Sequence, residues 1–312
     1  MIYIKYPLIS LDSNVDLVTW HQTVDAKKDW KSLRSYLTAH LSVPHDIQDF
    51  NPKCWYTEME QLDINSQDVE HFRPKDFSKR LTTSHRTKIE REIGYSVPED
   101  LAQIRYTWLE LNHNNYRFTT ALSNRGGGKH SAFPVLTGTA RLISPTLPTG
   151  TNEFPLLLDP TIEHDANQLL VIPSGEIMPK ATKIVLTAND LANYQQVWYT
   201  EPINFLRSWV SIFVYRLDNP HLIKGRKIVF SKVINLTNEL EQVFGKSHDA
   251  TIFICKEIQR LISSFSQFAL AARCALLSYD GNNSSNVETG KKVQQILTRI
   301  YENVIDREKN AL

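Results

Sequence analysis

Two short clusters contain the residues of this chain that are best suited to chemistry. In the first, Asp68-Val69-Glu70-His71-Phe72-Arg73-Pro74-Lys75, a carboxylate directly precedes a histidine and a basic turn follows. In the second, Asn115 lies nine positions before Asn124, which is followed by Arg125, three glycines and Lys129. Carboxylate and amide oxygens bind hard cations, and a neutral imidazole accepts a proton near neutral pH. These residue types together predict hydrolysis of a phosphodiester with the help of a divalent cation.

The chemistry assigns roles to three of these side chains. His71 suits the base that deprotonates the attacking water, and the oxygens of Glu70 and Asn124 suit Mg²⁺ or Mn²⁺. Because consecutive residues of a strand point to opposite faces, Glu70 and His71 need a local bend, which the turn at Pro74 could provide. The alternatives are that His71 is a buried structural histidine and that the glycines form a plain loop. His130 is expected to be a surface or structural residue.

The stretch from Glu70 to Lys75 resembles the first motif of HNH endonucleases. Its amino-acid sequence is similar to that of the corresponding motif in the HNH subunit of Septu anti-phage systems, the PtuB-like proteins. Further segments follow in the order found in that subfamily. They are Tyr106-Thr107-Trp108-Leu109, Asn115 nine positions before Asn124, Lys129 with Phe133-Pro134, and Pro155-Leu156-Leu157-Leu158-Asp159-Pro160. The resemblance covers about residues 54–160 and continues more weakly to about 190.

The resemblance implies an α+β protein with a ββα-metal (HNH) nuclease core. It implies that His71 is the general base and that Glu70 and Asn124 hold Mg²⁺ or Mn²⁺. Asn115 would orient His71 or its loop, and Lys129 would contact the scissile phosphate or organise the site. The function that follows is that of an HNH endonuclease, the effector of a bacterial anti-phage system. The alternative is a catalytically degenerate HNH fold that serves as a nucleic-acid-binding or scaffold subunit.

Basic residues outnumber acidic ones between residues 72 and 91. A local excess of this kind binds a nucleic-acid backbone even on a chain whose net charge is +1. The predicted contacts to nucleic acid are Arg73, Lys75, Lys79, Arg80 and Arg125. The glycines at 126–128 would let backbone N–H groups approach a phosphate. We expect DNA in preference to RNA; the alternative for the basic run is a solvated helix face.

The chain departs from the family at its zinc knuckles. Family members usually carry two CxxC pairs that bind a structural zinc, whereas the corresponding positions here are Cys54, Thr57, Thr120 and Ser123. One thiolate cannot supply the four nitrogen or sulfur ligands of structural zinc. We therefore predict no structural zinc. HNH domains of CRISPR effector nucleases also lack the knuckles, so this loss is compatible with catalysis.

The remaining pattern predicts three regions. Residues 1–50 form a strand and helix segment, with apolar residues at helical steps from Trp20 to Leu41. Residues 51–195 form the HNH domain with a β extension, and residues 196–312 form a helical C-terminal region. The expected short strands are 155–160 and 168–187, with a turn at Ser174-Gly175. The expected helices are 198–217, 233–244, 252–277 and 287–308.

The helical region is larger than an HNH module needs. Its apolar stripes, over 252–277 and 293–304, are either an internal core or a docking surface for a partner. The family resemblance implies that the partner is a PtuA-like ABC-type ATPase, sometimes with a retron reverse transcriptase and its noncoding RNA. We find no nucleotide-binding Walker motif in the chain, which agrees with an ATPase supplied by another protein.

Bulk composition excludes little. The 312 residues are 41% hydrophobic and 22% charged, as is ordinary for a globular protein. The three cysteines form no CxxC pair, which indicates a reducing compartment. The N-terminus lacks the apolar segment of a signal peptide, and no run reaches the roughly 18 apolar residues of a membrane span. A cytoplasmic protein without a membrane partner is therefore expected.

Overall fold

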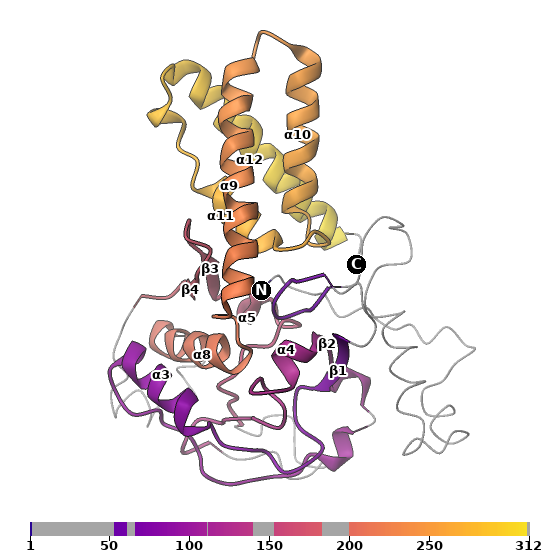
Figure 1. Cartoon of the computed structure of the whole chain (residues 1–312), viewed down its shortest axis with the longest axis vertical. Helices are drawn as coiled ribbons and strands as arrows, with labels where there is room; N and C mark the ends of the chain where they lie inside the picture. The colour runs from indigo at the N-terminus through magenta and orange to yellow at the C-terminus, as the bar shows by residue number, and fades with distance from the viewer. Residues whose placement is uncertain (2–52, 61–65, 111, 140–152, 183–199, 311–312) are drawn as a thin grey trace, which may run out of the picture. The chain divides into compact units, whose positions relative to one another are not determined.

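The structure, a computed structural model, describes residues 1, 53–60, 66–110, 112–139, 153–182 and 200–310 (Figure 1). The strand and helix predicted in residues 1–50 lie outside these residues, except for Met1. The described part contains eight α-helices and two small two-stranded sheets. This confirms the α+β class predicted from the sequence.

The described residues fall into two compact units. The first contains the described residues up to Leu169 and those from Pro179 to Leu217, and the second contains Leu170–Met178 and the described residues from Asp218 onward. Helix α8 (Glu201–Val214) therefore belongs to the first unit, although the sequence placed a boundary at 195/196. The reason is its buried contacts there, since α8 packs on α3 (Thr83–Ile93) and Arg207 pairs with Asp165 at 2.6 Å.

The first unit is built around a strand pair and a short helix. Strand β1 (Gln67–His71) pairs antiparallel with β2 (Tyr116–Thr120), which places Glu70 opposite Arg117 and His71 opposite Tyr116. Helix α4 (Ala121–Asn124) follows β2 directly, and the Thr120 hydroxyl caps it by accepting a hydrogen bond from Ser123 N–H. Because α4 packs on both strands, the end of the helix lies beside β1.

Around this centre the first unit has short elements and long irregular segments. Helix α3 is capped by Thr82 and ends at Gly94, whose φ of 86° is in the left-handed region. The other short elements are η2 (Thr107–Leu109), η3 (His113–Asn115) and α5 (Glu163–Ala166).

The strand predicted at 155–160 is wrong. Only an isolated bridge, between Val135 and Pro155, forms there, although Leu156, Leu157 and Leu158 are fully buried. Leu156 N–H donates to the Pro134 carbonyl at this bridge, and beyond it the backbone of the segment is bonded to side chains of α8. Ser211 accepts from Leu158 N–H at 2.8 Å, and Arg207 donates to the carbonyls of Pro155 and Leu157.

The strands predicted within 168–187 are present but short. They are β3 (Leu169–Val171) and β4 (Ile177–Pro179), and residues 183–187 lie outside the described residues. The turn between them is at Ser174-Gly175, as predicted. Gly175 has φ +88°, and a side chain there would collide with backbone atoms of Ile223 and Lys227. The turn therefore requires glycine for both conformation and space.

The second unit is a helical assembly in which α9, α10 and α12 run alongside one another (Figure 1). Its elements are α9 (Pro220–Val243), α10 (His248–Ile262), α11 (Ala269–Leu277), η4 (Gly281–Asn283) and α12 (Val287–Asn310). Helix α9 begins well before the predicted residue 233, because Asn219 caps it and Pro220 occupies its first turn. The helix predicted at 287–308 is confirmed.

The single helix predicted over 252–277 is wrong, because the chain breaks between α10 and α11. Ser263 is extended, and Phe268 has a left-handed φ of 55°. The Ser266 hydroxyl donates to the Arg260 carbonyl, a side-chain bond of the kind that competes with helical hydrogen bonding.

The apolar stripes of the helical region form its own core. Their buried members are Ile254, Ile258, Leu261, Ile262, Val293, Leu297 and Val304. These side chains are therefore not an exposed docking surface. In the part of the chain that the structure describes, no helix has both the length and the apolar character needed to cross a bilayer.

Candidate functional site

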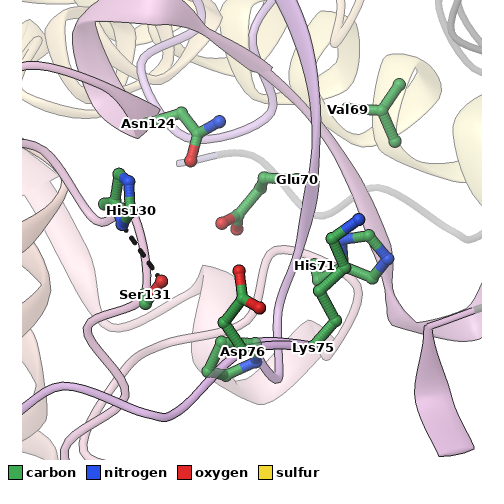
Figure 2. Close-up of a pocket in the computed structure, with 9 residues that line it drawn as sticks. Val69, Glu70, His71, Lys75, Asp76, Asn124, His130 and Ser131 are labelled. Carbon is green, nitrogen blue, oxygen red and sulfur yellow. Dashed lines mark hydrogen bonds between the residues drawn. The ribbon is translucent and has the colours of Figure 1, made fainter. Parts of the chain in front are cut away.

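Four of the predicted site residues, Glu70, His71, Lys75 and Asn124, line an open pocket of about 180 Å³ in the first unit (Figure 2). Its lining is Val69, Glu70, His71, Pro74, Lys75, Asp76, Asn124, His130 and Ser131. These residues come from β1, the turn after it, the end of α4 and the loop beyond the three glycines. The antiparallel pairing of β1 and β2, with α4 directly after β2, therefore brings the two sequence clusters together.

Glu70 is 3% exposed and lies at the centre of the pocket-lining residues (Figure 2). One carboxylate oxygen accepts a hydrogen bond from the Tyr56 hydroxyl, and the other is 2.8 Å from the Lys129 ammonium. Burial raises the pKa of Glu70, and Lys129 and Tyr56 partly offset that rise. The carboxylate is thus held in one orientation by two buried partners.

Lys129 is 1% exposed, so its ammonium is not presented to solvent. Besides Glu70 it contacts the backbone carbonyl of His71, to which it donates at 2.8 Å. The sequence left two roles open, contact with a scissile phosphate or organisation of the site. The observed contacts correspond to the second, because Lys129 ties the glycine loop to the end of β1.

His71 has a fixed ring orientation. Its Nε2 lies 2.8 Å from the carbonyl oxygen of Glu110, and its ring packs edge-on against Tyr116 with centroids 5.1 Å apart. A carbonyl only accepts, so Nε2 carries the hydrogen and Nδ1 carries the lone pair. Burial lowers the pKa of His71 to about 4, which keeps the ring neutral at pH 7. A neutral imidazole of defined tautomer is the form that a general base requires.

Asn124 has its amide group oriented by a carboxylate. Its Nδ2 donates to Asp68 at 3.2 Å, and its oxygen points toward the space beside Glu70 (Figure 2). Asp68 also binds Arg125 through two hydrogen bonds, one of them 2.8 Å. Asp68 and Glu70 lie on the same face of β1, so alternation along the strand could have identified Asp68 from the sequence.

Asn115 holds the turn that follows His71. Its side-chain oxygen accepts from Arg73 N–H at 2.8 Å, and its amide donates to the Arg73 carbonyl at 2.8 Å. A third bond reaches the Leu109 carbonyl, and the Asn115 carbonyl accepts from Phe72 N–H. These bonds fix the turn that follows β1. The bend that the sequence required between Glu70 and His71 is not formed, because β1 keeps a regular register through both residues, opposite Arg117 and Tyr116.

The five predicted nucleic-acid contacts differ in their surroundings. Arg73 pairs with buried Glu153 at 2.7 Å, Arg125 pairs with Asp68, and Lys75 lies 3.2 Å from Glu110 while lining the pocket. Lys79 and Arg80 are exposed, and Arg80 donates to the Leu101 carbonyl. Carboxylate partners therefore reduce the local positive charge that the sequence suggested.

The glycine loop is shaped by close packing. A side chain on Gly128 would collide with the backbone of Leu122 and Ser123 in α4, whereas Gly126 has open space around its Cα. Gly128 N–H already donates to the Arg125 carbonyl, so this group binds the protein itself.

Gly128→Ala is expected to destabilise the first unit by about 1–3 kcal/mol through overpacking. Gly126→Ala is the matched control, whose φ of +52° is within the range that other residues adopt at smaller cost. Urea unfolding of both variants measures the difference. Equal stability of the two variants would show that close packing at Gly128 has no energetic importance.

Besides Asp68, three residues lie at the site that were not placed there from the sequence. Tyr56, which binds Glu70, also stacks on Tyr215 with centroids 3.9 Å apart. Asp76 lines the pocket directly after Lys75. His130 is exposed, as expected for a surface residue, and it also lines the pocket, with φ +44° and its Nδ1 3.0 Å from the Ser131 hydroxyl. Its position next to Lys129 was the available signal.

The four zinc-knuckle positions form two turns that lie against each other. Thr57 N–H donates to the Cys54 thiol, and Ser123 N–H donates to the Thr120 hydroxyl. The Cys54 sulfur is 3.7 Å from the Thr119 hydroxyl, and the Thr120 and Ser123 hydroxyls are 3.3 Å apart. Hydrogen bonds thus stabilise these two turns, at the positions where a zinc-binding relative would carry cysteine thiolates.

The low pKa of His71 predicts a pH effect on stability. As pH falls below the ordinary value of about 6.5, the unfolded chain binds a proton at His71 that the folded chain accepts only near 4. The free energy of unfolding should therefore decrease by up to about 3 kcal/mol as the pH falls from about 6.5 to about 4. Urea unfolding of metal-free protein should show a smaller loss for His71→Asn. An identical pH dependence in both proteins would contradict the assigned burial of His71.

No group of three or more histidine, cysteine or acidic side chains with metal-binding geometry occurs among the described residues. Comparison of the chain with protein-family models, with curated proteins and with solved structures found no match.

Proposed function

We propose that the protein is a metal-dependent HNH-type endonuclease that hydrolyses phosphodiester bonds of nucleic acid. The observation that supports this function most directly is that Glu70, His71 and Asn124 all line one pocket. The carboxylate of Glu70 and the amide oxygen of Asn124 face the same space (Figure 2), and the ring of His71 is neutral with its tautomer set by the Glu110 carbonyl. The pairing of β1 with β2, with α4 packed on both strands, supports a ββα core, in which α3 would be an insertion between the strands.

The donor set is compatible with Mg²⁺ or Mn²⁺. Both ions prefer oxygen ligands, and Mg²⁺ commonly takes one or two protein groups while keeping several waters. Glu70 and Asn124 supply such oxygens, and the Asp68 carboxylate fixes which end of the Asn124 amide faces the pocket. A bound cation would polarise the phosphate and stabilise the leaving oxygen.

The protein residues account for the remaining steps. His71 takes the proton of the attacking water at Nδ1, because its Nε2 is engaged with the Glu110 carbonyl. Asn115 keeps the adjoining turn in place, and Lys129 holds the His71 carbonyl. A phosphate bound nearby adds negative charge, which raises the basicity of His71 from its low value in the free protein.

The test is a nicking assay on the full chain with DNA and RNA substrates, with and without an ABC-type ATPase partner. Cleavage is expected with Mg²⁺ or Mn²⁺ and absent with a chelator. Elemental analysis is expected to find no stoichiometric zinc, in keeping with the single cysteine of the knuckle positions. One tightly bound zinc per chain would contradict that expectation. DNA is the expected substrate.

The second candidate is a degenerate HNH fold that binds nucleic acid without cutting it. The Lys129 ammonium beside Glu70 favours this alternative, because it already neutralises one ligand charge. Binding without cleavage under every metal and partner condition would support it. In either role we propose a cytoplasmic protein that acts with a PtuA-like ATPase, sometimes with a retron reverse transcriptase and its noncoding RNA.

A further inference from the structure

A short extended segment leads from the pocket onto the surface of the first unit. Lys75 and Asp76 line the pocket, and the next residues are bridged to neighbouring segments, Phe77 to Arg105 and Lys79 to Ala132. Ser78 between them is 2% exposed and bonded through its N–H and hydroxyl to Ile104.

Side chains alternate along an extended segment. Because the Ser78 side chain points into the protein, the side chains of Phe77 and Lys79 point to solvent. Their Cα atoms are then about 7 Å apart. Phe77 is 52% exposed and Lys79 is exposed. The segment therefore presents an aromatic ring and a cation in register beside the pocket.

Phe77 differs from other exposed apolar residues in its surroundings. Single exposed apolar side chains are common and need no explanation. The only other aromatic among the large exposed hydrophobic residues of the described chain is Phe253, on α10. Phe77, in contrast, directly follows pocket residue Asp76, and the exposed Arg105 guanidinium lies 4.1 Å from its ring centroid. This contact holds the ring and adds positive charge next to it.

We propose, on the basis of the nuclease function proposed above, that Phe77 and Arg105 form a stacking platform for an unpaired base next to the scissile phosphate. The preferred substrate is then single-stranded or locally unpaired nucleic acid. Aromatic rings and arginine planes bind bases by stacking, with lysines following the backbone. In a duplex the faces of the bases are covered by their neighbours, so Phe77 contributes little to duplex binding.

The experiment measures binding by fluorescence anisotropy in the full-length His71→Ala protein, which does not cut the probe. The probes are a labelled DNA oligonucleotide and the same sequence annealed to its complement. Phe77→Ala is expected to weaken single-strand binding by about 5- to 150-fold, the range for loss of one stacked base. Phe77→Trp is expected to retain it. Phe253→Ala is the matched control and is expected to change nothing.

The outcomes separate this inference from the proposed function. Equal weakening of single-strand and duplex binding by Phe77→Ala would show a backbone contact and overturn the stacking platform. Unchanged single-strand binding would also overturn it, while metal-dependent cutting by the wild type would leave the nuclease function standing. Failure of the wild type both to bind and to cut any nucleic acid would remove the nuclease function and this inference with it.

Discussion

Replacement of His71 by alanine is expected to slow phosphodiester cleavage by about 10²–10⁴-fold, the usual loss when a general base is removed. The reason is the position and state of the ring. His71 lines the pocket with Glu70 and Asn124, and its ring is neutral at pH 7 with a tautomer set by the Glu110 carbonyl. The fold should be retained in the variant, because the other residues of the first cluster keep their hydrogen bonds and ion pairs when His71 is replaced.

The measurement compares cleavage rates at saturating Mg²⁺ for the wild type and the variant. His221→Ala, at an exposed histidine of the second unit, is the matched control and should cut at the wild-type rate. The thermal shift on adding Mg²⁺ should be similar in the wild type and His71→Ala, since His71 is not an expected ligand. A variant that cuts as fast as the wild type would remove His71 from the mechanism.

Four residues named from the sequence, Glu70, His71, Lys75 and Asn124, line one pocket because the segments that carry them are local. Glu70 and His71 are consecutive, and Asn115 and Asn124 are separated only by one strand and a short helix. Pairing of β1 with β2 is then enough to bring Glu70, His71 and Asn124 to one pocket, while Asn115 holds the adjoining turn. Helical periodicity was similarly sufficient for α12, whose apolar positions recur at regular steps.

The partners of the site residues required knowledge of distant segments. Glu153 and Tyr215, which contact Arg73 and Tyr56, come from parts of the chain far from either cluster. The basic residues considered without their carboxylate partners therefore suggested more positive charge than the folded protein presents. The break after α10 was also not predicted. The apolar pattern continues through residues 263–268, but a side-chain hydrogen bond from Ser266 to the Arg260 carbonyl competes with the helical hydrogen bonds there.

The segment Pro155–Pro160 shows a prediction that local sequence got wrong and a contact that only the fold reveals. Its sequence predicted a strand, but its structural role is to deliver Asp159 to β2. There Arg117 donates to both Asp159 oxygens, at 2.7 and 2.5 Å, and both side chains are almost fully buried. Burial alone would raise the pKa of Asp159, but Arg117 and hydrogen bonds from Thr161 more than offset it, so the pKa lies below its ordinary value.

Asp159→Asn is therefore expected to lower the free energy of unfolding by about 3–5 kcal/mol, because it leaves the Arg117 guanidinium buried without its counter-charge. Arg117 lies opposite Glu70 in the β1–β2 pair, so the loss should also reduce cleavage at temperatures where the fold persists. Urea unfolding at neutral pH measures the effect. The control is Glu288→Gln, which breaks an exposed pair with Lys292 and should leave the free energy of unfolding nearly unchanged. An Asp159→Asn protein as stable as this control would show that the buried pair does not hold β2 in place, and the link between the 155–160 motif and the site would fail.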